Sequence, residues 1–373
     1  MKKFLVTGIL FSLAVFSFTS CDSDDDDTPW VEPEVKTTGV YILNSGSMGQ
    51  NNSTLDYYDP TTNIYTGKIF ENQNNNLKIG DTGNNMVIYG SKMYIFATNS
   101  NKIYITDLKG KLLKYEDNTD AIISPLNASN QPQKPREGVA YNGKVYVSLY
   151  DGYVAKIDTS SMNITQTVQV GTYPEQLAVA KNKLYVANSG YGDGTTVSEI
   201  DLNSFTVSKT INVEVNPNKV LSDKNGNVYI ISWGKYSNDS QAILQKYDPS
   251  KDEFTVLGRK IASKGALNKD QSKLLLIAQV YDETWNSTTK FQTFDLNSNT
   301  LDEKSFITPP SDFDASKAYC ITVDPTNGDI YVGLSDYKTN GSMYVFSSDG
   351  TYKTKLNTNG INPMGAYFVT GTK

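Results

Sequence analysis

Residues 142–170 read NGKVYVSLYDGYVAKIDTSSMNITQTVQV and contain three consecutive β-strand patterns. A short apolar and β-branched run is followed by two runs of alternating polarity, and tight turns separate them. The three runs cover residues 145–148, 153–157 and 164–170, and a fourth strand pattern at 138–141 precedes them across an Asn142-Gly143 turn. Four antiparallel strands joined by hairpins cannot bury both faces of their sheet alone. We therefore expect further units of the same kind to pack beside this one.

The same unit recurs along the chain, and its second strand carries an apolar tetrad centred on tyrosine. The tetrads lie at residues 40–43, 93–96, 145–148, 184–187, 228–231, 274–277 and 330–333. Their second residue is tyrosine in every case except Leu275, and successive tetrads are between 39 and 56 residues apart. Four-stranded repeats of roughly 40–50 residues are typical of propeller blades. The sequence therefore predicts an all-β fold, a seven-bladed β-propeller over residues 38–373.

The two ends of the repeat region complement each other. The first tetrad has no complete strand before it, whereas residues 361–370 form a strand pattern with no unit after it. We expect this C-terminal strand to become the innermost strand of the first blade, which closes the ring and removes its open edges.

The N-terminus has the pattern of a lipoprotein signal peptide rather than of a folded element. Lys2 and Lys3 precede an apolar run at 4–18, which ends in small residues before Cys21. This run is too short for a spanning helix, and acyl chains on Cys21 would anchor the mature chain to a membrane. We predict a signal peptide at 1–20 and a lipidated, acidic and proline-containing linker at 21–37. Its aspartate-rich run at 22–27 is expected to stay solvated and extended, and it could be a plain spacer.

Composition excludes several classes of function. The chain has no histidine, so a Ser-His-Asp triad, a Cys-His pair and a histidine-ligated metal site are all excluded. The net charge is −6 and no basic stripe occurs, which argues against nucleic-acid binding. If Cys21 is lipidated, Cys320 has no partner within the chain, and its apolar surroundings predict a buried, inert thiol. We predict no metal site and no catalytic residues.

A candidate binding surface is predicted where the loops between second and third strands meet the connections between blades. In an antiparallel blade whose first strand is innermost, both sets emerge on the same face of the ring, while tight polar hairpins such as Asn142-Gly143 emerge on the other. Aromatic and amide side chains are dense in these loops and suit a large neutral ligand with a flat apolar surface and many hydrogen-bonding groups. The predicted ligand-binding residues are Asn44, Met48, Asn85, Asn99, Arg136, Glu137, Tyr150, Tyr173, Tyr191, Trp233, Tyr236, Tyr281, Trp285, Tyr337 and Asn362.

Two other interpretations of these loops stay open. The asparagines also fit ordinary turn chemistry, whereas tryptophan is rarely used to fill a loop. Carboxylates such as Glu137, Glu175 and Asp282 could meet on this face as an acid/base pair, although no spacing rule supports one.

The motifs that carry a family resemblance are GVYILN at 39–44, STLDYYDP at 53–60, GDTGNNMVIYGSKMY at 80–94, DGYVAKID at 151–158 and PEQLAVA at 174–180. They resemble the YncE-like propellers of surface lipoproteins, most closely the cobalamin-capturing BtuG type. The resemblance runs from about residue 38 to the C-terminus and includes the lipoprotein head. The aspartate run after Cys21 also resembles the surface-export signal of lipoproteins in Bacteroidota-type Gram-negative bacteria.

The resemblance implies a lipid-anchored protein on the outside of the outer membrane. It would capture cobalamin (vitamin B12 and related corrinoids) and pass it to a TonB-dependent transporter, without being an enzyme or holding a cofactor of its own. A corrin has a broad face and a rim of amides, which agrees with the aromatic and amide groups of the loops. The alternative is a scaffold or glycan-binding accessory lipoprotein of another TonB-dependent uptake system, and a propeller lyase or lactonase is a third interpretation.

Overall fold

The computed structural model describes residues 34–235, 242–282, 284 and 286–372. The predicted signal peptide, Cys21 and the first part of the linker lie outside these residues. All strands belong to the unit that begins at Val35.

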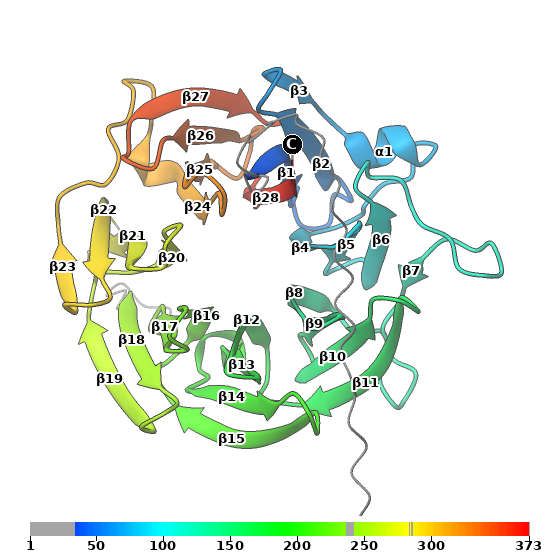
Figure 1. Cartoon of the computed structure of the whole chain (residues 1–373), viewed down its shortest axis with the longest axis horizontal. Coiled ribbons are helices and arrows are strands. Elements are labelled where there is room, and N and C mark those ends of the chain that lie inside the picture. The colour runs from blue at the N-terminus through cyan, green and yellow to red at the C-terminus, as the bar shows by residue number, and fades with distance from the viewer. Residues whose placement is uncertain (1–33, 236–241, 283, 285, 373) are drawn as a thin grey trace, which may run out of the picture. The chain divides into compact units, whose positions relative to one another are not determined.

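The described strands form seven antiparallel sheets of four strands each, arranged as the blades of a ring (Figure 1). From the innermost strand outward, blade one contains β28 (Pro363–Thr372), β1 (Val35–Asn44), β2 (Thr54–Asp59) and β3 (Ile64–Thr66); blade two β4 (Gly83–Tyr89), β5 (Lys92–Ala97), β6 (Lys102–Asp107) and β7 (Ile122–Ile123); blade three β8 (Pro135–Tyr141), β9 (Lys144–Leu149), β10 (Tyr153–Asp158) and β11 (Asn163–Gln169); blade four β12 (Pro174–Ala180), β13 (Lys183–Asn188), β14 (Thr196–Asp201) and β15 (Thr206–Asn212). Blade five contains β16 (Pro217–Ser222), β17 (Val228–Ser232), β18 (Ile243–Asp248) and β19 (Glu253–Gly258); blade six β20 (Lys264–Leu267), β21 (Lys273–Tyr281), β22 (Ser287–Asp295) and β23 (Thr300–Asp302); blade seven β24 (Ala318–Val323), β25 (Ile330–Leu334), β26 (Ser342–Phe346) and β27 (Tyr352–Asn357). The short helices of the described part are α1 (Ile69–Gln73) and the 3-10 turns η1 (Gly190–Gly192) and η2 (Ala315–Lys317). The predicted seven-bladed propeller is confirmed.

The C-terminal strand closes the ring as the sequence predicts. β28 pairs antiparallel with β1, and the register places Tyr367 opposite Tyr41 and Ala366 opposite Ile42. The first blade thus contains the last strand of the chain beside its first three strands. It is therefore a complete four-stranded sheet where the seventh blade packs against it.

The tyrosines of the tetrads lie in the hydrophobic layers between blades. Tyr41, Tyr94, Tyr185 and Tyr229 are at most 2% exposed. Tyr94 packs with Val145 and Val147 of the next blade, for example. Burying such a side chain contributes about 1.5–3 kcal/mol. The repeated tetrad is therefore the part of the sequence that holds neighbouring blades together.

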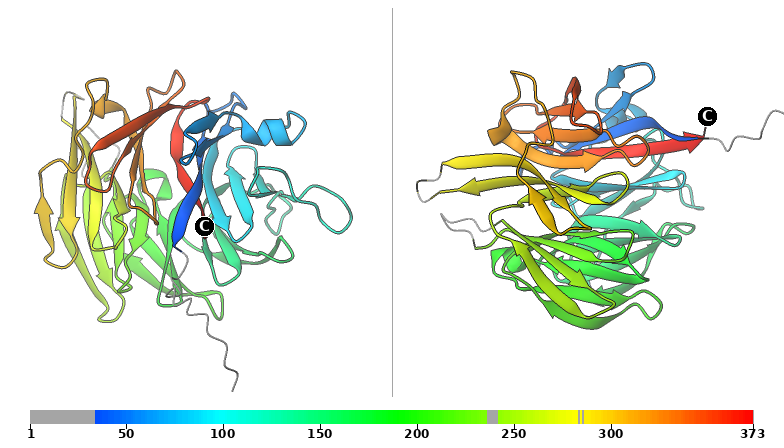
Figure 2. Two further views of the ribbon diagram at one scale, coloured as in Figure 1. Left: turned by 45° about the horizontal axis from the view of Figure 1, so that its top comes forward. Right: turned by 60° about the vertical axis from the view of Figure 1, so that its left-hand side comes forward.

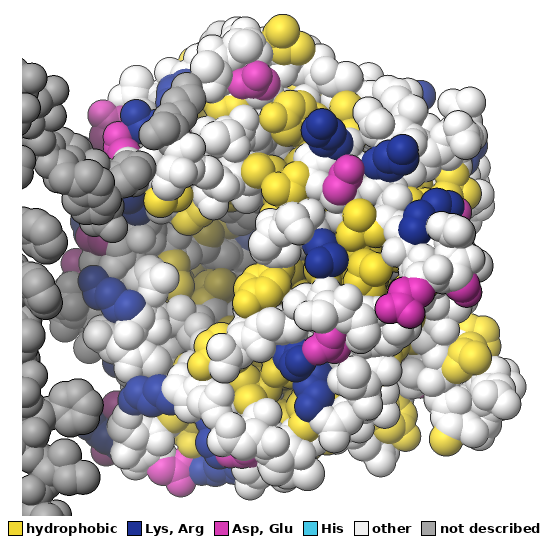
Figure 3. Space-filling model, turned by 45° about the vertical axis from the view of Figure 1, so that its right-hand side comes forward, with side chains coloured by type: hydrophobic (Ala, Val, Ile, Leu, Met, Phe, Trp, Pro, Cys, Tyr) yellow, Lys and Arg dark blue, Asp and Glu magenta, His cyan; other side chains and the backbone are white. Residues whose placement is uncertain are grey.

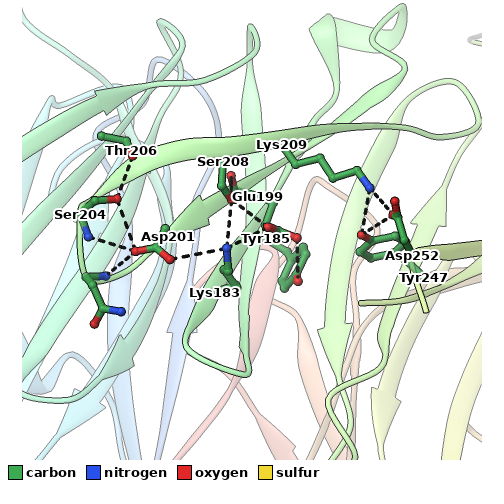
Figure 4. Close-up of polar contacts among 11 residues, drawn as sticks. Lys183, Tyr185, Glu199, Asp201, Ser204, Thr206, Ser208, Lys209, Tyr247 and Asp252 are labelled. Carbon is green, nitrogen blue, oxygen red and sulfur yellow. Dashed lines mark hydrogen bonds and ion pairs between the residues drawn. The ribbon is translucent and has the colours of Figure 1, made fainter. Parts of the chain in front are cut away.

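Polar contacts add to these layers near the outer strands, as Figure 4 shows for blades four and five. The Tyr185 hydroxyl donates to Glu199 Oε2 at 3.0 Å, and Ser208 donates to Glu199 Oε1 at 2.7 Å. Lys209 of β15 contacts both the Tyr247 hydroxyl, at 3.3 Å, and the carboxylate of Asp252. The two blades are therefore joined by charge as well as by apolar packing.

The ring has two unlike faces. On the face that we call the loop face, the loop between the second and third strands bonds to the connection that enters the same blade in six of the seven blades. Examples are the amides of Ser45, Tyr150, Ser189, Trp233 and Ser335, which donate to carbonyls of residues 362, 134, 173, 216 and 317. The opposite, hairpin face carries tight turns such as Asn142-Gly143, in which both residues have positive φ. The predicted division of loops between the faces is confirmed.

One hairpin extends past the others on the loop face. β21 and β22 have nine residues each, and Figure 2 (right) shows them projecting beyond the neighbouring strands on the side away from the C-terminus. On the side of the molecule drawn in Figure 3, basic, acidic and hydrophobic side chains are interspersed. No described helix is both long enough and apolar enough to cross a bilayer.

Candidate functional site

A cavity of about 590 Å³ lies at the centre of the ring, and the innermost strands of all seven blades line it. Two loop-face side chains, Trp233 and Tyr337, also contribute to its wall. The cavity is therefore reached by the same loops that the sequence predicts to bind a ligand.

One position near the start of each innermost strand forms a ring of side chains, which we call the channel ring. Each member lies two residues after a proline, glycine or alanine, as in Pro135-Arg-Glu137 and Pro217-Asn-Lys219. The members are Asn85, Glu137, Gln176, Lys219, Lys264 and Cys320, and blade one has Gly365, which carries no side chain, at the equivalent position. In six of the seven innermost strands the pairing register shifts close to this point. Bulges of this kind turn side chains toward functional sites, here toward the channel.

A chain of polar contacts follows one side of the channel ring. Asn85 donates to the Tyr367 hydroxyl at 3.4 Å and to Glu137 Oε2 at 3.5 Å. Glu137 Oε1 in turn accepts from Lys219 Nζ at 2.8 Å. The contacts join blades one, two, three and five, so they stiffen the channel across blades that are not neighbours.

A second charged group lies beside this chain, under the loop face. Arg136 Nε donates to Glu175 Oε2 at 2.8 Å, and the guanidinium also contacts Asn84 and covers the Tyr150 ring at 4.7 Å. Tyr150 donates its hydroxyl to Glu175 Oε1 at 2.7 Å. Burial opposes the charge of Arg136, but Glu175, Tyr150 and Glu137 together outweigh it and raise the pKa of the guanidinium above its usual value. Arg136 is therefore a fixed cation.

Three tyrosines form a row that leads from this arginine to the surface. Tyr150 contacts Tyr173 with ring centroids 5.4 Å apart, and Tyr173 contacts Tyr191 at 5.1 Å. Tyr173 is 40% exposed and Tyr191 is 70% exposed. A second aromatic group stands across the ring on blade seven, where Tyr319 meets Tyr337 edge to face at 5.5 Å and Tyr337 is 66% exposed.

The exposed tyrosines are held in an unfavourable backbone conformation. Tyr173, Tyr191 and Tyr337 have φ values of 49°, 58° and 64°. A bulky residue in this left-handed region is a genuine outlier, whereas asparagine tolerates it. At the position of Tyr173, before the proline that starts the innermost strand, blades five and one use Asn216 and Asn362. Met162 and Phe205 adopt the same conformation in turns away from the loop face, so the backbone strain accompanies the exposed rings without by itself assigning them a role.

The predicted site residues divide into two groups. The structure brings Asn85, Arg136, Glu137, Trp233 and Tyr337 together around the cavity. Tyr150, Tyr173 and Tyr191 adjoin them through Arg136. Tyr281 is partly exposed at the end of β21, the projecting strand. Tyr236 and Trp285 lie outside the described residues.

The remaining predicted residues serve the loops or stand apart from the cavity. Asn44 is fully buried and donates to Thr54 Oγ1 at 3.1 Å and to Asp56 Oδ2 at 2.8 Å. Asn362 is almost fully buried and donates to the Gly46 carbonyl at 2.9 Å. Asn99 donates to Thr82, and Met48 is 80% exposed but is not part of the cavity wall. Asn44 and Asn362 therefore match the turn-chemistry interpretation rather than ligand contact.

Comparison with known protein families identifies the family of this chain. The family described as "Domain of unknown function (DUF5074)" matches residues 38–369. The chain belongs to this family. No curated protein sequence matches it significantly.

Solved structures resemble the DUF5074 propeller in fold. Hydrazine synthase from Kuenenia stuttgartiensis is 12% identical, with a TM-score of 0.60 over 78% of this chain and 95% of that one. A quinonprotein alcohol dehydrogenase-like protein from Bacteroides thetaiotaomicron is 16% identical, with a TM-score of 0.58 over 89% and 78%. The dihydro-heme d1 dehydrogenase NirN is 10% identical, with a TM-score of 0.56 over 91% and 77%. At these identities the likeness establishes the fold alone.

Sequence reasoning missed three members of the channel ring, Gln176, Lys219 and Lys264. Their shared signal is the spacing of two residues after proline, glycine or alanine at the start of the innermost strand. Cys320 belongs to the same ring, and the residue is partly exposed toward the cavity, so the predicted buried thiol lies at the channel wall. Burial raises the pKa of this thiol to about 12, so it is protonated at neutral pH.

The carboxylates of the candidate site already form ion pairs or hydrogen bonds with neighbouring residues. Glu137 and Glu175 face Lys219 and Arg136, and Asp282 accepts from Thr284 and Asn286 in its own loop. Among the described residues, no three acidic or cysteine side chains gather closely enough to hold a metal ion. The arrangement offers aromatic surfaces around a polar cavity, which is the chemistry of binding a ligand.

Proposed function

We propose that this protein captures a corrinoid of the cobalamin type on its loop face. The supporting observation is the pair of exposed aromatic groups beside one central cavity, with three of the tyrosines held in left-handed backbone. Rigid tyrosine rings supply contact area at a small loss of conformational entropy. A macrocycle lying across the loop face would meet these rings with its flat surface.

The groups below the rings suit the polar rim of such a ligand. Amides and hydroxyls near the loop face, among them Asn85, Gln176 and Tyr367, can donate to or accept from amide side arms. Because the chain contains no histidine, the protein has no imidazole to replace the lower axial base of the bound corrinoid. The ligand would therefore bind with its own lower base in place.

The N-terminal pattern supports a cellular location for this activity. The signal-peptide pattern, Cys21 and the acidic run together favour a lipid-anchored protein on the outside of the outer membrane. There the propeller would deliver its ligand to a TonB-dependent transporter. It needs no catalytic residue for this task.

A titration of cyanocobalamin into the purified chain by calorimetry tests the proposal. We expect one ligand per chain, and we expect Tyr191→Ala to weaken binding by about fivefold to a hundredfold, since stacked rings contribute about 1–3 kcal/mol in comparable sites. The matched control is Tyr89→Ala, because Tyr89 is an exposed tyrosine at the end of β4, on the hairpin face. No binding at micromolar protein would contradict the proposal, and so would equal losses in the two variants.

A glycan-binding accessory protein is the second candidate. The observation that favours it is the row Tyr150–Tyr173–Tyr191, which is extended and adjoins the Arg136–Glu175 pair, as a platform for successive sugar rings would be. A panel of oligosaccharides in the same calorimeter separates the two candidates. Binding of a sugar and not of cyanocobalamin would select the second.

A further inference from the structure

The charges of the channel do not balance. Arg136, Glu137, Lys219 and Lys264 are the charged side chains that line the cavity. Arg136 is neutralised by Glu175 and Lys219 by Glu137, as described above. This leaves the ammonium of Lys264 as one positive charge without a counter-charge.

Lys264 has a polar neighbour but no acidic one. Its Nζ donates to Gln279 Oε1 at 3.2 Å, and no carboxylate of the described residues lies within ion-pair distance of it. Its neighbours on the channel ring are Lys219 of blade five, which repels it, and Cys320 of blade seven. Burial, together with Lys219, lowers the pKa of the Lys264 ammonium to about 8, so it is still mostly protonated at neutral pH.

The weakly acidic groups around Lys264 do not supply the missing charge. Burial holds the pKa of the Cys320 thiol at about 12 and that of the Tyr319 phenol at about 12. Burial also raises the pKa of Tyr367 above its usual value. All three groups are therefore neutral at the pH where Lys264 is charged. A buried cation without a partner is costly, and an anion that enters the cavity would remove that cost.

We propose that the cavity is an anion site in which Lys264 binds one singly charged oxyanion, a phosphate diester or a carboxylate, of the captured ligand. Gln279 orients the ammonium, and the Gln176 side chain and the Tyr367 hydroxyl offer further polar contacts in the same cavity. On the proposed function, on which this step rests, the macrocycle stays at the loop face and an anionic arm reaches down to the channel ring. The phosphodiester of the nucleotide loop of cobalamin is an arm of that charge.

Two corrinoids that differ in this arm test the proposal. Cyanocobalamin carries the phosphodiester, whereas dicyanocobinamide lacks it. We expect Lys264→Met to weaken cyanocobalamin binding by about tenfold to a hundredfold, the range for a hydrogen bond to a charged group, and to leave cobinamide binding within about threefold. Lys264→Arg, which keeps the charge, should recover part of the loss. Lys109→Met removes an exposed lysine from the turn after β6 and should change neither affinity.

The outcomes separate this proposal from the proposed function. An equal loss for both corrinoids, or no loss for cyanocobalamin, would overturn the anion site while leaving corrinoid capture intact. If neither corrinoid binds the unaltered chain, the proposed function fails, and small anions then test the site alone. Inorganic phosphate or acetate, compared with chloride at equal ionic strength, should raise the Tm of the unaltered chain and of Lys109→Met but not that of Lys264→Met. The same shift in all three proteins, or no shift in any, would overturn the anion site, and the comparison of phosphate with acetate shows which oxyanion it prefers.

Discussion

The Lys219 ammonium lies 2.8 Å from the Glu137 carboxylate, although the two residues belong to blades five and three. Blade four stands between these blades, and its channel-ring residue, Gln176, carries no charge. The ion pair therefore connects blades that share no sheet edge and no hydrophobic layer. It links the two blades directly across the channel and fixes part of the polar channel wall.

Removing one partner of this pair should destabilise the fold. Glu137 is 5% exposed, so Glu137→Gln leaves Lys219 without its counter-charge near the channel, and we expect a loss of about 1–3 kcal/mol in unfolding free energy. Urea denaturation measures it. Glu303→Gln is the matched control, because the Lys290–Glu303 pair is exposed on both sides and its loss should change stability by less than about 1 kcal/mol. Equal effects of the two substitutions would show that the channel pair has no structural role.

The stability contributed at Lys264 should depend on pH in the alkaline range. In the folded chain burial, together with Lys219, lowers the pKa of Lys264 to about 8, below the usual value of 10.5. The unfolded chain therefore binds more protons between these two values, so the Lys264 contribution to stability rises as pH increases from about 8 to 10.5. We expect the unfolding free energy of the unaltered chain, minus that of Lys264→Met, to increase over this range. The other titratable groups near Lys264 are present in both proteins, so their own titrations largely cancel in this difference. These groups are Tyr319, Tyr367, Cys320, Arg136, Glu137 and Lys219. A difference that does not change with pH would contradict the lowered pKa of Lys264.

The thiol of Cys320 should react slowly in the folded protein. Since burial raises its pKa to about 12, the thiolate fraction at pH 8 is on the order of a thousandfold below that of an unperturbed cysteine. In a Cys21→Ala background, iodoacetamide should modify Cys320 far faster in urea than in buffer, as mass spectrometry can follow. Equal rates in the two conditions would show that the channel gives the thiol no protection.

The left-handed backbone of Tyr173 should make stability and binding change in opposite directions. Asparagine tolerates φ of 49° better than tyrosine, and blades one and five already use it at this position. We expect Tyr173→Asn to raise the unfolding free energy by about 0.5–1 kcal/mol, as the relief of part of the strain in such a position allows, and to weaken cyanocobalamin binding. Denaturation and calorimetry on the same protein check both. A variant that loses stability and keeps full affinity would contradict the functional interpretation of the strain.

The proposed lipid anchor at Cys21 can be tested by its effect on where the chain lies in the cell. If Cys21 carries the proposed acyl chains, Cys21→Ala should lower the mass of the mature protein by those chains and should release the propeller from the membrane fraction. Replacing the aspartates at 22–27 with serine should keep the lipid and abolish cleavage of the propeller by protease added to intact cells. If the serine variant is cleaved as fast as the unaltered chain, the acidic run is a plain spacer.

The fold could be predicted from the sequence because its signals are local and repeated. Each tetrad places a tyrosine, or in one case Leu275, in a layer between blades, and seven copies of the repeat indicate a seven-bladed ring. The place of the C-terminal strand could be predicted because it had no unit after it and the first blade lacked one strand. Its observed start at Pro363 lies two residues beyond the predicted one.

The site was predictable only in part. Aromatic residues such as Tyr191 and Tyr337 stand out in loops because burial does not explain them there. Asn44 was predicted as a ligand contact because asparagine is common in binding loops, but it ends a strand whose last six residues are all buried. Lys264 was missed because its meaning depends on charges from other blades. Glu137 and Lys219, for example, are 82 residues apart in the chain, and only the closed ring brings them into contact.

Footprinting of the tyrosines with and without cyanocobalamin shows which face of the ring the ligand covers. Hydroxyl radicals modify exposed rings, and mass spectrometry reports each position separately. We expect saturating ligand to protect Tyr173, Tyr191 and Tyr337 on the loop face. Tyr89 on the hairpin face and Tyr352 on the outer strand β27 should stay as reactive as before. Unchanged reactivity at the three loop-face tyrosines, or protection at Tyr89 instead, would contradict capture on the loop face.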